Sequence, residues 1–161
     1  MTVLDLNEVK DALNIKQTAT DAQINALIGQ AESFVANRCG PLESTPQTSR
    51  VRGGGDLVLP WTPVLSVGTV TGLDSGAAVT VTDAQVDLAA GVIYGTFDES
   101  RYEVAYTAGR TSCPDDLLRA ALEICRHLWR PQRGAEQRSD AMSALRLAED
   151  LMEPHLLPGF A

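Results

Sequence analysis

The side chains that could carry acid–base or metal chemistry are few in this sequence, and their spacing does not suit such chemistry. The two histidines are His127 and His155. His127 lies two residues after Cys125, a spacing that points the two side chains to different faces of a helix, and no HExxH-type pattern surrounds it. His155 follows Pro154 in an irregular stretch without an evident partner. We therefore expect structural or solvent-exposed histidines and no metal ligand.

A carboxylate pair and a glycine run resemble functional motifs only in part. Asp115 and Asp116 are adjacent, so their side chains would diverge on a helix, and acids are favoured in a first helical turn for stability alone. The run Gly53–Gly55 is not followed by the Lys-Ser/Thr of a phosphate-binding loop, and we interpret it as a hairpin tip. No Ser/His/Asp or Cys/His signature is present. We predict no catalytic residue, no cofactor and no enzyme.

Arginines form a stripe in the segment that follows Pro114. Arg119, Arg126 and Arg130 are spaced to share one helix face, and Glu123 lies between them. The stripe has three interpretations: a solvated face with an internal ion pair, a nucleic-acid contact, or a contact with an acidic surface of another subunit. The net charge of −8 and the pI near 4.6 argue against a phosphate-binding surface. The other two interpretations remain open.

The bulk composition is that of an ordinary folded protein, with 44% hydrophobic and 21% charged residues in 161. This length predicts one domain. Cys39, Cys113 and Cys125 form no CxxC motif, which favours reduced, structural thiols. The N-terminus lacks the regions of a signal peptide, and no apolar run reaches the ~18–20 residues of a membrane span. We expect a soluble protein.

Helical periodicity occupies both ends of the chain. A short helix is predicted at "LDLNEVKDAL", and a longer one runs from an N-cap at Thr20, with Gln23 closing a capping box, to a stop at Gly40. Pro114 opens a third helix. Ser139 or Asp140 caps a fourth helix that ends near Met152.

Between the helices, from residue 47 to 108, apolar residues alternate with period two and glycines interrupt them, which predicts short antiparallel strands. The predicted fold class is α+β: a mainly helical core of about four helices with an antiparallel β insertion between the second and third main helices. We divide this single domain into N-terminal helices (1–46), β insertion (47–110), C-terminal helices (111–153) and an extended apolar tail (154–161).

The order of these parts resembles the head–tail connector (adaptor) proteins of tailed bacteriophages. "LDLNEVKDALNI" and "TDAQINALIGQAESFVANRCG" are similar to the opening helix pair of that family, and "LVLPWTPVLSVGTV", with Pro60 and Pro63, to the entry of its variable β insertion. The segment "YEVAYTAGRTSCPDDLLRAALEICRHLW" is the most specific match, carried by Tyr106, Ala108, Gly109, Pro114, Ala120, Ala121, Trp129 and Arg130. The last helix and "EPHLLPGFA" follow no pattern of that family.

The resemblance implies a structural virion protein and not an enzyme. Such proteins form a ring, typically of about twelve copies, that docks under the portal protein, extends the DNA channel and joins the capsid to the stopper or tail-completion protein. The expected place is the neck of the virion, after assembly in the host cytoplasm, with no membrane partner. An acidic chain suits a lumen through which DNA passes without sequence-specific binding.

Within such a ring, the arginine stripe would be an interface to a neighbouring subunit or to the portal. Its acidic counterpart would be the side of the second helix that carries Asp21 and Glu32. The apolar "LLPGFA" would be a liability if exposed, so Leu156, Leu157 and Phe160 are predicted to be buried against the portal or a neighbour.

An alternative from another class is a stand-alone binding module, monomeric or dimeric, that uses its β segment to hold a partner protein. The same arginines and tail would serve such a module. The size of the oligomer distinguishes it from a ring.

Overall fold

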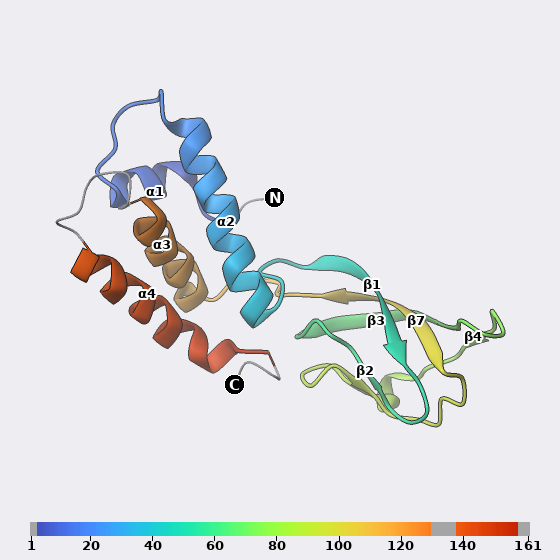
Figure 1. Ribbon diagram of the computed structural model, residues 1–161. Helices are drawn as coiled ribbons and strands as arrows, with labels where there is room; N and C mark the ends of the chain where they lie inside the picture. Colours follow the sequence, from blue (N-terminus) through green and yellow to red (C-terminus); the bar gives the residue numbers. More distant parts are fainter. Residues whose placement is uncertain (1–2, 130–137, 158–161) are drawn as a thin grey trace. The chain divides into compact units, whose positions relative to one another are not determined.

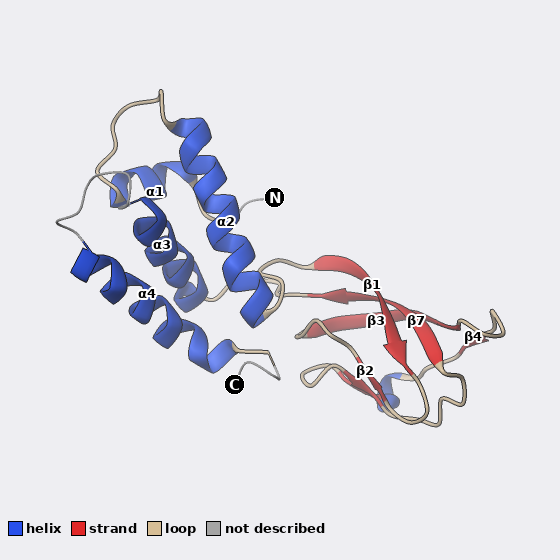
Figure 2. Ribbon diagram, in the orientation of Figure 1, coloured by secondary structure: helices blue, strands red, loops and turns tan. Residues whose placement is uncertain are grey.

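The computed structural model describes residues 3–129 and 138–157. The chain forms two compact units, which we call the helical unit (Met1–Leu42 with Ser112–Ala161) and the β unit (Glu43–Thr111) (Figures 1 and 2). The α+β class is confirmed, because antiparallel sheets are inserted between the second and third helices. Folding of all 161 residues as one cooperative domain stays a prediction.

The helical unit contains α1 (Leu6–Ala12), α2 (Asp21–Cys39), α3 (Asp115–Trp129) and α4 (Arg138–Met152), followed by the 3-10 turn η4 (Glu153–His155). α3 lies between α2 and α4 (Figure 1). The apolar stripes predicted from the sequence meet in one core, in which Val9, Ile24, Ile28, Leu117 and Met152 are almost fully buried.

The helix ends follow local chemistry with one exception. The Oδ1 of Asp5 accepts hydrogen bonds from the backbone N–H groups of Asn7 (2.8 Å) and Glu8 (3.3 Å) and so caps α1. Gly40 ends α2 with a positive φ of 84°, as predicted. Thr20 is the N-cap residue of α2, as predicted, but the predicted capping box is wrong: the ψ of Thr20 is 1° instead of an extended value, and its buried Oγ1 has no hydrogen-bond partner.

The β unit contains two antiparallel sheets. The first has the strand order β1-β7-β3-β4, and the second has the order β2-β6-β5. The strands are β1 (Thr45–Arg52), β2 (Leu57–Val58), β3 (Val64–Gly72), β4 (Ala78–Val79), β5 (Val86–Asp87), β6 (Val92–Ile93) and β7 (Arg101–Ala108). A core of its own fills this unit, with Leu57, Val70, Ile93 and Val104 at 0 or 1% exposure.

The glycine run at 53–55 is not the hairpin tip that the sequence suggested. β1 pairs with β7, while β2 pairs with β6, so the run carries the chain from one sheet to the other. Gly53 N–H donates to the carbonyl of Ser100 (3.0 Å) and Gly54 N–H to that of Phe97 (2.7 Å). A side chain at Gly53 would collide with the backbone oxygen of Glu99. Gly53 is therefore required by a close backbone approach, whereas Gly54 and Gly55 have positive φ values of 90° and 154°.

Candidate functional site

The arginines of the α3 stripe differ in their exposure and in their contacts within the chain. Arg119 is exposed, whereas Arg126 is half-buried and its Nη1 donates to the Oε1 of Glu123. Glu123 is only 6% exposed, so Arg126 neutralises a buried carboxylate within its own helix. Arg130 lies outside the described residues. Arg119 is thus the described arginine of the stripe whose charge is most accessible to another molecule.

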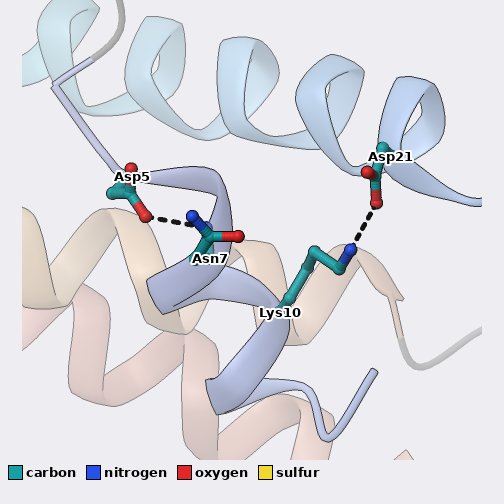
Figure 3. Close-up of polar contacts among 4 residues, drawn as sticks. All are labelled: Asp5, Asn7, Lys10 and Asp21. Atoms are coloured by element: carbon teal, nitrogen blue, oxygen red, sulfur yellow. Dashed lines mark hydrogen bonds and ion pairs between the residues drawn. The ribbon is translucent and has the colours of Figure 1, made fainter. Parts of the chain in front are cut away.

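The two acids predicted to face a neighbour both have contacts within the chain. The Nζ of Lys10 lies 2.6 Å from the Oδ1 of Asp21, which links α1 to α2 (Figure 3). The Oε1 of Glu32 accepts hydrogen bonds from the backbone N–H groups of Val3 (2.6 Å) and Leu4 (2.8 Å). These contacts fix the N-terminal segment on α2. A role for Asp21 and Glu32 toward a neighbour stays a prediction.

The predicted docking tail is partly built into the helical unit. Leu157 is 6% exposed, and its backbone N–H donates to the carbonyl of Arg38 at 2.7 Å. Leu156 is half-buried against the helical core, and Phe160 lies outside the described residues. Because Leu157 is already covered, it presents little apolar surface to another molecule. The interface role of the tail stays a prediction for Leu156 and Phe160.

His155 has a neighbour that the sequence did not reveal. Its Nε2 lies 3.9 Å from the Oδ2 of Asp116, so the turn after α4 approaches the first turn of α3. Among residues 3–129 and 138–157, no group of three or more His, Cys, Asp or Glu side chains could hold a metal ion. No helix in the described part of the chain is both long and apolar enough to cross a membrane.

Sequence reasoning missed a second group of arginines, which lies on the β unit. Arg50 and Arg52 lie two residues apart on β1, and the strand register places Arg101 of β7 directly opposite Arg52. Beside them is an open concavity of about 430 Å³, lined by Arg50, Arg52, Asp56, Val58 and Pro60 and by the glycine run. The two-residue spacing in "SRVR" was a signal for a shared face. The pairing of distant strands could not be read from the sequence.

Comparison with known proteins finds a family and similar solved structures. The family model described as "Head completion protein" matches residues 2–140. Among solved structures, a chain from "Neck of native GTA particle computed with C12 symmetry" is similar with a TM-score of 0.58 and 22% sequence identity, over 99% of this chain and 94% of that one. At 22% identity, the similarity is evidence for a shared fold only. No curated protein gives a significant match.

Proposed function

Because the chain belongs to the head completion protein family, we propose that it is a ring-forming neck protein that joins the capsid to the tail. Members of this family are structural proteins and not enzymes. The proposed ring has twelve copies, as suggested by the C12 symmetry of the neck that contains the similar chain. It docks under the portal protein and extends the DNA channel.

The observation that carries this proposal is the extent of the family match, which covers residues 2–140 and so includes the whole β unit and the helical unit up to the first residues of α4. The similar fold in another neck supports it. The further partners that we propose are the stopper or tail-completion protein on the far side of the ring and the DNA in its lumen. The net charge of −8 is suited to DNA that passes without specific binding.

Imaging by negative stain tests the proposal, with purified protein alone and with its candidate portal protein. We expect rings of about a dozen copies, either free or only on the portal. A chain that stays monomeric or dimeric and never joins a portal would instead support the stand-alone binding module.

The contact between neighbours that we propose from the sequence uses the stripe of α3, and its test must avoid the buried ion pair. Replacing Arg126 by Glu would place a second carboxylate beside the buried Glu123 and would disturb folding as well as assembly. Arg119→Glu reverses an exposed charge and is the cleaner variant. If Arg119 faces an acidic neighbour, this variant weakens ring assembly while its helix content stays unchanged. Normal assembly of Arg119→Glu would count against the stripe.

The tail proposal also needs two matched deletions. Removal of residues 154–161 eliminates the buried Leu157, and loss of such a side chain costs about 1.5–3 kcal/mol of folding stability. Removal of residues 158–161 leaves the contact between Leu157 and Arg38 in place. If Phe160 docks on the portal, the shorter deletion weakens docking and keeps the melting temperature of the wild type, whereas a role of Leu156 alone shows only in the longer deletion. Normal docking of both variants would reject the role of the tail.

A further inference from the structure

The outward face of the β1–β7 ladder carries an excess of positive charge, which we call the arginine cluster (Arg50, Arg52 and Arg101). Arg52 and Arg101 are exposed and lie directly opposite each other in the antiparallel register. Side chains in such positions have Cβ atoms about 4.5–5.5 Å apart, and like charges there are destabilising. Glu103 is opposite Arg50, with 3.3 Å between its Oε2 and the Nε of Arg50. The ladder thus places one carboxylate among three guanidinium groups.

This excess of charge is not offset by the one ion pair. The side chain of Arg50 is 71% exposed and that of Glu103 is 41% exposed, so the pair is screened by water and contributes little. The like charges of Arg52 and Arg101 repel each other, which lowers folding stability. The register of the ladder places no carboxylate directly opposite either of them. A binding role would explain why such a pair is present.

The concavity beside the cluster adds an apolar edge to the charged face. Arg50 and Arg52 line one part of it, while Val58 and Pro60 line another. Val58 is 63% exposed, which is the largest exposed fraction among the large apolar side chains that the structure describes. Charged forks next to an exposed apolar side chain fit a protein surface better than a small inorganic anion.

The helical unit carries several acidic side chains where α2 and α4 end and α3 begins (Figure 1). Here Glu149 lies 3.5 Å from Arg38, and Asp116 lies 3.9 Å from His155. Three further acids in the same segments are exposed. We call this group the acidic end; it consists of Asp115, Asp116, Glu149, Asp150 and Glu153.

We propose that the arginine cluster of one copy binds the acidic end of the next copy. This inference rests on the proposed ring, in which each contact is heterologous and every copy must carry two different, complementary surfaces. Arginine is suited to carboxylates because its planar fork donates two parallel hydrogen bonds. Phosphate groups of DNA are a less suitable ligand, since a chain of net charge −8 repels the duplex around any local cluster.

The first test is Arg52→Glu, measured for stability and for assembly. The new glutamate would face Arg101 across the strands, so the repulsion is replaced by attraction and the melting temperature of the protein stays equal or rises. Assembly, measured by sedimentation velocity under conditions where the wild-type chain forms rings, is expected to weaken about a hundredfold. The control Lys16→Glu makes the same change of net charge at an exposed position of the helical unit and leaves assembly unchanged.

The second test reverses both surfaces and mixes the variants. Arg52→Glu with Arg101→Glu, and separately Asp150→Arg with Glu153→Arg, are each expected to lose assembly. A mixture of the two double variants is expected to regain it, because each reversed surface then finds an opposite charge on the other chain. Glu8→Arg, on the exposed side of α1, is the control for the acidic reversal.

The outcomes separate this inference from the proposed function. Wild-type rings together with normal assembly of Arg52→Glu would overturn the inference and leave the ring intact. Loss of assembly in both double variants without recovery in the mixture would also overturn it, since the surfaces would then not bind each other. A wild-type chain that forms no ring, alone or on its portal, would overturn both.

Discussion

Glu123 is a buried acid of the helical unit, and the arginine that pairs with it determines how the α3 stripe is interpreted. It has arginines four residues before it and three residues after it, and the structure selects Arg126. The carboxylate is 6% exposed, whereas the side chain of Arg126 is 34% exposed and so reaches solvent at its edge. Arg126 therefore contributes to the stability of the fold, in addition to any contact it makes outside the chain.

Arg126→Ala is expected to lower the free energy of unfolding by about 2 kcal/mol, because it leaves a buried carboxylate without its charged donor. Chemical denaturation followed by circular dichroism measures this change. Arg119→Ala is the matched control on the same helix and is expected to stay within about 0.5 kcal/mol of the wild type. Equal effects of the two substitutions would show that the pair with Glu123 is not a stabilising one.

Cys125 is a buried thiol whose chemistry is suppressed by its surroundings. Burial, with a smaller effect from Glu32, raises the pKa of Cys125 from 9.0 to about 12. As pH rises, the thiol loses its proton in the unfolded state before it does so in the folded state. Its contribution to folding stability is therefore fully present below pH 9 and is lost as pH rises toward 12.

We expect a thiol reagent at pH about 8 to modify Cys113 in the native protein and to leave Cys39 and Cys125 unmodified, because only the thiolate reacts and both of these side chains are buried. All three thiols become reactive after unfolding. Cys113→Ser supplies the control, since it removes the accessible thiol. Rapid labelling of native Cys113→Ser would contradict the burial of the other two.

At the scale of the elements, the sequence predicted the helices better than the strand pairings. Helix periodicity, Pro114 and Gly40 are local signals, and they located α2 and α3 to within a few residues. The capping box at Thr20 failed because a motif of the right composition took a different backbone angle. The Gly53–Gly55 hairpin failed because β1 pairs with β7, about 50 residues away, and no local signal reports such a pairing.

The same limit applied to the candidate sites. The α3 arginines were found because i, i+4 and i, i+7 spacings are visible in a helical sequence. The arginine cluster of the β unit was missed because it depends on the register between Arg52 and Arg101. The internal partner of Glu32 is the backbone of Val3 and Leu4, and backbone partners leave no trace in residue types.

The turn between β3 and β4 is held by a carboxylate from another loop. Glu99 accepts hydrogen bonds from the Oγ–H of Ser75 and from the backbone N–H groups of Asp74 (2.8 Å) and Ser75 (3.4 Å). Asp74 in turn accepts from the backbone N–H (3.2 Å) and the Oγ–H (2.9 Å) of Ser100. These reciprocal contacts fix the turn to the segment that enters β7, the central partner of β1 and β3.

The hydrogen bond from Ser75, followed by that from the backbone of Asp74, lowers the pKa of Glu99 from 4.5. A lowered pKa means that the stabilisation is present above pH 4.5 and is lost as pH falls through the folded-state value. We expect Glu99→Ala, or acid in the wild type, to lower the protection of the Asp74 and Ser75 amides against hydrogen exchange, measured relative to the intrinsic exchange rate at the same pH. Asp98→Ala, at the exposed neighbouring position, is the control. Unchanged exchange in Glu99→Ala would show that the turn is held by its own residues.

At the scale of the whole molecule, charge is distributed unevenly while the total remains negative. The 21 acidic residues outnumber the 13 basic ones, yet three of the arginines gather on one ladder of the β unit. The proposed ring would need both properties: an overall field that repels phosphates, and local groups that recognise carboxylates at short range. Screening confines the second effect to distances below about 10 Å in ordinary salt.

This distribution predicts that the purified chain does not shift duplex DNA in a gel-shift experiment at about 50 mM salt and micromolar protein. Proteins that bind DNA non-specifically do shift it under these conditions. Arg52→Glu should behave like the wild type in this experiment, because its arginine is assigned to a carboxylate contact between copies. A DNA shift with the wild type that is lost with Arg52→Glu would mean that the arginine cluster binds phosphates. The contact with the acidic end would then be the wrong assignment, and the proposed ring would bind DNA instead of letting it pass.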